Sequence, residues 1–112
     1  MTIKIDEWLN LAIEKLQKSF KEKLLFVGLQ GSYNRGEATP ESDIDLVVIL
    51  DKLSFEDLKE YRKIIDEMSN KELACGFISG KKELQNWSKC DLFQFFYDTK
   101  SLVCRVQFFA PV

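Results

Sequence analysis

Two aspartates, Asp43 and Asp45, stand two residues apart at the start of an apolar run that ends at Leu50. Because side chains alternate between the two faces of a strand, both carboxylates are predicted to leave the same face. Two adjacent carboxylates repel each other, and a divalent cation is the usual compensation. Mg²⁺ in particular is bound by one or two carboxylates together with phosphate oxygens. The pair therefore predicts a magnesium site at the mouth of a strand.

A Gly-Ser turn lies shortly upstream, at Gly31 and Ser32. Backbone N–H groups and a hydroxyl in such a turn can bind phosphate oxygens. Considered alone, the pair also fits an ordinary turn in which Ser32 caps a helix. The aspartates that follow favour phosphate binding, and Arg35 fits either a solvated loop cation or a phosphate contact. The whole stretch predicts a site for a metal and a nucleotide.

Three short segments of this stretch carry a likeness to a known family: Gly31-Ser32, Arg35-Gly36-Glu37-Ala38 and Ser42-Asp43-Ile44-Asp45-Leu46. At this spacing they resemble the signature of the DNA polymerase β-like nucleotidyltransferase superfamily, and its small stand-alone members, the minimal nucleotidyltransferases, in particular. The resemblance implies that the paired acids bind Mg²⁺, with two ions in the family, and that the Gly-Ser turn binds the triphosphate. It also implies transfer of a nucleoside monophosphate, most simply AMP from Mg-ATP, to an acceptor.

The same resemblance implies a third acid on a neighbouring strand. The next predicted strand begins near Leu73 and has no acid in its middle, so Glu72 is the candidate third metal ligand and catalytic carboxylate. If Glu72 does not reach the pair, the alternative is a degenerate module of the same fold that binds a nucleotide or a partner, such as an antitoxin-like subunit. A plain structural domain would leave the two aspartates without a metal.

Composition limits the remaining possibilities. The 112 residues contain no histidine, so proton transfer must use a carboxylate, water or lysine, and any metal must be bound by oxygen. The net charge of −2 gives no broad basic surface, so a long duplex nucleic acid is not expected as a partner. Three scattered cysteines, no signal-peptide core and no apolar run long enough to span a membrane predict a cytoplasmic protein.

The elements that must position this chemistry can be read from periodicity. Helical spacing predicts a helix from Ile5 to Lys21 and another, capped by Ser54, that runs to Met68 with Phe55, Leu58, Tyr61, Ile65 and Met68 buried. Strands are predicted over 24–29, 43–50, 73–79 and 102–109, with short helical segments at 31–36 and 81–87. The strand–helix–strand order from Asp43 to Ser79 predicts a parallel pair.

These elements predict an α/β (α+β) fold, with a small mixed sheet of three to four strands and helices packed on it. We expect a single nucleotidyltransferase-like domain over residues 1–112. The aromatic segment 91–97 is expected to pack over the sheet, although base stacking on Phe95 or Tyr97 is an alternative. The apolar end, 106–112, predicts a buried strand or a subunit contact, so we expect a protein partner or a homo-oligomer.

Overall fold

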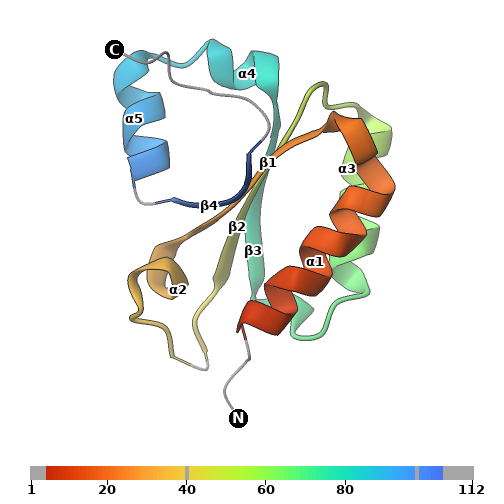
Figure 1. Cartoon of the computed structure of the whole chain (residues 1–112), viewed down its shortest axis with the longest axis vertical. Coiled ribbons are helices and arrows are strands. Elements are labelled where there is room, and N and C mark those ends of the chain that lie inside the picture. Colours follow the sequence, from red (N-terminus) through yellow and green to blue (C-terminus); the bar gives the residue numbers. More distant parts are fainter. Residues whose placement is uncertain (1–4, 40, 98, 105–112) are drawn as a thin grey trace.

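The computed structural model describes residues 5–39, 41–97 and 99–104. Its helices and strands follow in the order drawn in Figure 1: α1 Ile5–Phe20, β1 Leu24–Gln30, α2 Gly31–Arg35, β2 Ile44–Leu50, α3 Phe55–Asp66, β3 Ala74–Gly80, α4 Lys81–Gln85, α5 Lys89–Tyr97 and β4 Lys100–Cys104. Two short 3₁₀ turns, η1 Lys21–Lys23 and η2 Lys71–Leu73, precede β1 and β3. The predicted mixed α/β architecture is confirmed.

The four described strands form one mixed sheet in the order β3-β2-β1-β4. β1 pairs antiparallel with β2 and with β4, whereas β2 and β3 are parallel, with Ile44 opposite Ala74. The parallel pair predicted from the strand–helix–strand order is therefore present. β2 is flanked on both sides and is apolar on both faces beyond Asp45, as expected of a central strand.

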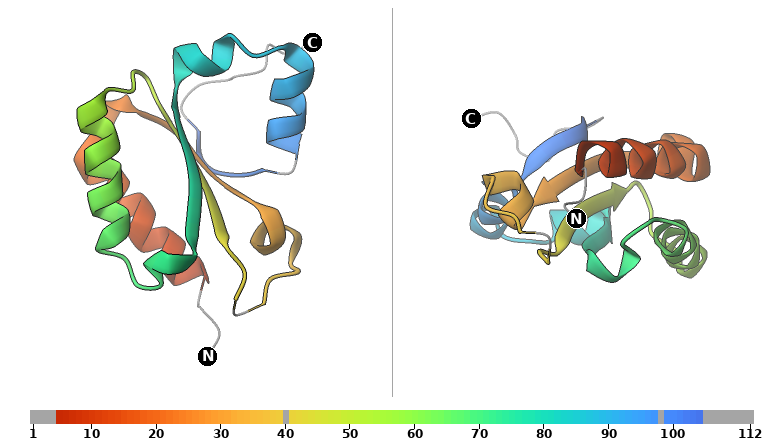
Figure 2. Two further views of the ribbon diagram at one scale, coloured as in Figure 1. Left: turned by 180° about the vertical axis from the view of Figure 1, so that it is seen from behind. Right: turned by 90° about the horizontal axis from the view of Figure 1, so that it is seen from below.

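Helices α1 and α3 lie together on one side of the sheet, and α4 and α5 lie on the other (Figures 1 and 2). The α1 stripe is buried as its spacing predicts: Trp8, Leu9, Ala12, Leu16 and Phe20. The opposite face carries a smaller core made of Phe26, Val47, Ile49 and Leu84, against which Phe77, Trp87 and Phe95 pack. The start of β2, where Asp45 lies, is at the end of the sheet beside α2 (Figure 1).

Helix α3 departs from the predicted stripe. It begins at a complete capping box, in which Ser54 and Asp57 exchange hydrogen bonds. Phe55 and Leu58, predicted to be buried, are 69% and 41% exposed, while Ile64 and Met68 enter the core. The buried side of the helix therefore includes Asp57 and Ile64 rather than Phe55 and Leu58.

The prediction for the last strand is also corrected at its boundary. The last strand, predicted over 102–109, begins earlier, at Lys100, and is described to Cys104. Residues 105–112, and with them the expected C-terminal contact, lie outside the described residues.

Among the described helices, none is long and apolar enough to cross a membrane.

Candidate active site

The Gly-Ser turn and the second aspartate meet at one end of the sheet. β1 ends at Gln30, which pairs with Asp45 across the antiparallel ladder, and α2 starts at the next residue. Gly31 adopts φ +77°, a left-handed conformation that glycine tolerates best. A Cβ atom at this position would fall on Oδ2 of Asp45. Only glycine therefore lets the turn approach the carboxylate so closely.

A pocket of about 390 Å³ opens at this junction. It is lined by Gly31, Ser32, Arg35, Thr39, Glu41, Ser42, Asp43 and Asp45. Five of the six residues singled out from the sequence thus lie around one space. The helix α2 that carries Ser32 and Arg35 has only five residues and ends at Gly36, whose φ of +72° terminates it.

The electrostatics of the pocket centre on Asp45. Partial burial, followed by the charge of Asp43, raises the pKa of the Asp45 carboxyl, while a hydrogen bond from Cys75 and the charge of Arg35 oppose this rise. Asp43 is exposed at the rim, one residue before β2 begins. An ionised Asp45 is therefore electrostatically disfavoured in the isolated chain, and a cation placed between the two acids would stabilise it.

These residues fit a hard divalent ion. The candidate metal ligands are carboxylate oxygens, which Mg²⁺ prefers. The pocket beside the turn leaves space for phosphate oxygens to complete the coordination. Within the described ranges, however, no group of three or more histidine, cysteine or acidic side chains is arranged to bind a metal ion. The predicted metal ligands that meet in the described part of the chain are therefore the pair Asp43 and Asp45.

Glu72 does not join that pair. The structure places it in η2, exposed, two residues before β3 begins, whereas the sequence suggested the first position of the strand. The 3₁₀ turn takes up the residues that were expected to extend the strand. A three-acid set of Asp43, Asp45 and Glu72 is therefore not formed here, and a catalytic role for Glu72 stays a prediction.

Cys75 is a neighbour of the site that the sequence analysis did not single out. It lies opposite Asp45 in the parallel register, and its side chain is exposed. Neighbouring residues in register on parallel strands share a face, so the Cys75 thiol lies beside the Asp45 carboxylate. The predicted parallel crossover could have located it, had the strand start been known to one residue.

Arg35 has a local partner as well as a place in the pocket. Its Nε lies 3.2 Å from Oε2 of Glu37. The pair is largely exposed, which keeps the interaction weak. Arg35 thus lies at the pocket with an exposed local partner, and its contact with a phosphate stays a prediction.

Gln30 fixes the start of the turn to a distant segment. Its Nε2 donates hydrogen bonds of 2.7 Å to the backbone oxygen of Phe95 and to Oγ1 of Thr99. Thr99 in turn donates to the same Phe95 oxygen. The residue before Gly31 is thereby held to the connection between α5 and β4.

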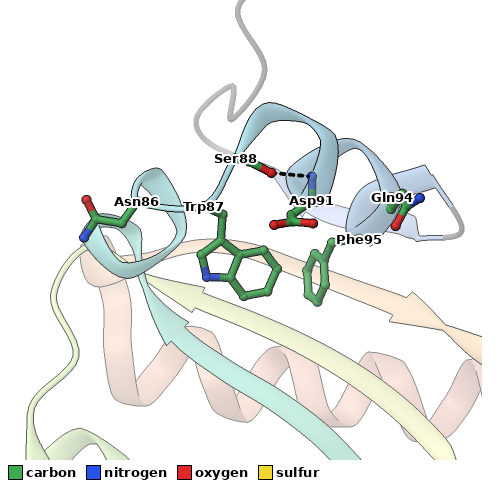
Figure 3. A pocket seen from close by; sticks show the side chains of 6 residues that line it. All are labelled: Asn86, Trp87, Ser88, Asp91, Gln94 and Phe95. Carbon is green, nitrogen blue, oxygen red and sulfur yellow. Dashed lines mark hydrogen bonds between the residues drawn. The ribbon is translucent and has the colours of Figure 1, made fainter.

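A second pocket, of about 660 Å³, lies by α4 and α5 (Figure 3). Trp87 and Phe95 lie side by side in it, with ring centroids 5.4 Å apart, and Phe95 also packs on Phe77 at 5.0 Å. Ser88 caps α5 by accepting a hydrogen bond from the Asp91 backbone. Phe95 belongs to the core on this face, which supports packing over base stacking, whereas the Tyr97 side chain is 80% exposed.

The nucleotidyltransferase domain family model matches residues 12–97, which is more than half of the chain. The chain belongs to this family. The match includes both aspartates, the Gly-Ser turn and the crossover to β3. Membership identifies a nucleotidyltransferase-type enzyme domain and agrees with the resemblance found in the motif.

Individual relatives support the same assignment. A candidate protein adenylyltransferase of Methanocaldococcus jannaschii is 44% identical over 46 residues, which is 41% of this chain and 46% of the relative. The chain therefore matches about half the length of that curated relative.

Solved structures share the fold. A candidate nucleotidyltransferase from Sulfolobus solfataricus superposes with a TM-score of 0.60 at 17% identity, over 88% of this chain and 79% of that one. A toxin–antitoxin structure with AMP-PNP gives 0.55 at 24% identity, over 83% and 71% of the two chains. At these identities, the likeness establishes the fold alone.

Proposed function

We propose that this protein transfers a nucleoside monophosphate, most simply AMP from Mg-ATP, to a hydroxyl acceptor. The observation that carries the proposal is the approach of the Gly31 turn to Asp45, with Asp43 in the same pocket. A phosphate-binding turn against two acids is the arrangement that a metal-bound triphosphate needs. Family membership supplies the reaction class.

Each side chain then has a defined task. The Gly31 N–H and the Ser32 hydroxyl bind the β- and γ-phosphates, and Arg35 contacts a phosphate oxygen. Asp43 and Asp45 would hold the Mg²⁺, which supplies charge neutralisation for the triphosphate when bound. Cys75, opposite Asp45 in the sheet, favours the ionised form of this carboxyl by counteracting the rise in its pKa.

The reaction is an in-line displacement at the α-phosphorus. The acceptor oxygen forms a bond to this phosphorus as the bond to the bridging oxygen breaks, and pyrophosphate leaves. The acceptor proton passes to a carboxylate of the pocket or to water, because the chain has no histidine. The turn keeps the departing phosphates in place while charge moves onto them.

A protein side chain is the acceptor class we favour. The Methanocaldococcus jannaschii relative is named as a candidate protein adenylyltransferase, and a solved complex of a tri-AMPylated toxin with its antitoxin contains a chain with a fold similar to this one. The toxin partner of an antitoxin-like subunit would present such a side chain. Transfer to a protein also fits a small domain whose pocket is open to one side.

The second candidate function is nucleotide or partner binding without transfer. The absence of a three-ligand metal set among the described residues favours it. The two functions differ in pyrophosphate release, because a binding module would bind Mg-ATP and return it unchanged.

Calorimetry and pyrophosphate release together test the proposal. The parent protein should bind ATP more tightly with Mg²⁺ than without it, and an Asp43→Asn/Asp45→Asn variant should lose that difference. Pyrophosphate should form slowly with water as acceptor in the parent and not in the variant. Binding without any pyrophosphate would favour the module, and equal binding by both proteins would refute the site.

Glu72 has its own test within the same assay. Glu72→Gln removes one exposed carboxylate and should leave folding unchanged. A loss of pyrophosphate release with unchanged ATP binding would assign it a catalytic role, while parental release would exclude one.

A further inference from the structure

A groove of about 710 Å³ runs between α3 and β3, on the side of the sheet that α3 covers. Figure 2 shows the helix alongside this strand. The small residues Ala74 and Gly76 of β3 form the floor of the groove, and α3 forms its wall. The catalytic pocket shares none of these residues.

β3 is an edge strand. It ends the sheet order, and none of the described strands pairs with its outer side. Cys75 and Gly76 are exposed along it. An edge of this kind presents unpaired N–H and C=O groups to any extended chain that lies beside it.

The wall of the groove is apolar where the helix begins. Phe55 and Leu58 are two of the large hydrophobic residues whose side chains remain exposed. Both line the groove. A pair of exposed apolar side chains beside a free strand edge offers contacts for alternate side chains of an added strand.

The charge of the groove selects among possible occupants. Three cations, Lys59, Arg62 and Lys71, line it with a single carboxylate, Asp66. Lys59 is engaged with the Phe55 ring at 4.7 Å and with Glu56. Arg62 and Lys71 have no ion-pair partner within the described part of the chain. We propose that this groove is a docking surface for an extended, acidic segment of a partner protein, which adds to β3 as a further strand.

The same charges argue against two other occupants. A second copy pairing β3 with β3 would bring the unpaired cations of both copies together, which like-charge repulsion opposes. The C-terminal residues 105–112 contain Arg105 and no acid, so they lack the charge that complements the groove. An extended acidic segment can pair with the backbone of β3 and also neutralise the cations of the groove.

Docking here would also bring the partner near the proposed chemistry. Strands in a sheet lie about 4.8 Å apart, so an added strand would run roughly 10 Å from β2. It would pass Cys75, which lies opposite Asp45. The surface consists of residues from α3, η2 and β3, and its binding of a partner does not depend on nucleotide transfer.

Synthetic peptides test the surface directly. The probe is a ten-residue peptide of alternating valine and glutamate with a fluorescent label, and its counterpart carries lysine in place of glutamate. We expect the acidic peptide to bind at least tenfold more tightly than the basic one. Amide hydrogen exchange measured by NMR should slow along β3 on binding, with no comparable change in β4.

A charge reversal supplies the decisive variant. Arg62→Glu/Lys71→Glu should lose at least tenfold in affinity for the acidic peptide and gain affinity for the basic one. Lys18→Glu/Lys82→Glu changes the net charge equally at exposed positions outside the groove and should bind like the parent. Thermal unfolding of each variant verifies that it is folded.

Several results would overturn the proposal. They are no binding of the acidic peptide, equal binding by the parent and the groove variant, or unchanged exchange along β3. Protection of β3 that depends only on protein concentration would instead assign the groove to a second copy, and would also refute an acidic partner.

Discussion

Cys75 on β3 lies directly opposite Asp45 on β2 in the parallel register, and a hydrogen bond from its thiol counteracts the rise in the pKa of the Asp45 carboxyl. The sheet thus places a neutral donor at the position from which a third carboxylate could reach the same ion. A bound Mg²⁺ would depend on the phosphates of the nucleotide for the ligands that the chain does not supply. The proposed site would therefore bind the metal and the nucleotide together.

Cys75→Asp should therefore tighten metal binding in the absence of nucleotide. A third carboxylate beside Asp45 would raise the affinity for Mn²⁺, used as a probe, by about tenfold, or roughly 1.4 kcal/mol. Without metal, the added repulsion should lower the melting temperature, and Mn²⁺ should restore it. Electron paramagnetic resonance of free Mn²⁺ measures the affinity.

Cys104→Asp is the control for this change. It places the same charge on β4, the opposite edge strand, where Cys104 is also exposed. Equal gains in Mn²⁺ affinity from both substitutions would mean that net charge alone, and not the position of Cys75, is responsible.

Gly31→Ala should abolish Mg-ATP binding. The new methyl group would fall on Asp45 Oδ2 and would also force alanine into a left-handed conformation. The conformational part costs about 1–2 kcal/mol, and the collision displaces either the turn or the carboxylate. Calorimetry with ATP and Mg²⁺ measures the loss of binding.

Gly36→Ala separates these two effects. Gly36 has a similar φ of +72°, but a Cβ there would have no neighbour within 4 Å. This variant should lose about 1–2 kcal/mol of stability and keep its affinity for Mg-ATP. If it loses binding as fully as Gly31→Ala, the close approach to Asp45 is not the cause.

Asp45→Asn should inactivate the protein without unfolding it. Burial, and then the neighbouring Asp43, raise the pKa of this carboxyl, so its ionised form is disfavoured in the apo fold. A neutral amide removes that repulsion, and the melting temperature should equal or exceed that of the parent. Pyrophosphate release should fall by about 100-fold or more, because a metal ligand is lost. A lower melting temperature would show that Asp45 has a structural role.

Asp57 gives stability that depends on pH. Burial favours the neutral acid, but hydrogen bonds from Lys23 and Ser54 and the charge of Lys23 outweigh it, so the pKa of Asp57 is lowered. The Lys23 Nζ lies 2.7 Å from the carboxylate, whose side chain is 12% exposed. A lowered folded pKa means that the stability is present above the unfolded value near 3.9 and is lost as pH falls through the folded value.

Urea unfolding at several pH values measures this contribution. Asp57→Asn should lose about 2 kcal/mol at pH 7, through the cap and the charged hydrogen bonds, and the deficit should shrink below about pH 4. Glu56→Gln, in the same helical turn but in an exposed pair 3.9 Å from Lys59, should change stability by less than about 0.5 kcal/mol. A deficit that persists unchanged at low pH would exclude the ionised carboxylate as its source.

The sequence predicted the fold wherever periodicity was strong. The α1 stripe, the apolar β2 and the parallel crossover all followed from local pattern, because each element buries a continuous face. Phe55 and Leu58 also fit helical spacing but are exposed in the structure. Which side of α3 faces the core depends on tertiary contacts, and local periodicity does not specify these. The error in the start of β3 affected the predicted site more, because a shift of one residue changes which side chain of β3 lies beside Asp45.

The two hydrogen bonds from Gln30 join the phosphate turn to Phe95 and Thr99, which follow it by more than sixty residues. A displacement of the α5–β4 connection would leave the Gln30 amide without its acceptors, at a cost on the order of 1–3 kcal/mol. This cost arises at the residue next to Gly31. The conformation of the α5–β4 connection therefore influences the stability of the Gly31 turn. By thermodynamic reciprocity, a triphosphate that orders the turn also strengthens the attachment of α5. A nucleotide bound at the proposed site would therefore stabilise the α5–β4 connection as well as the turn.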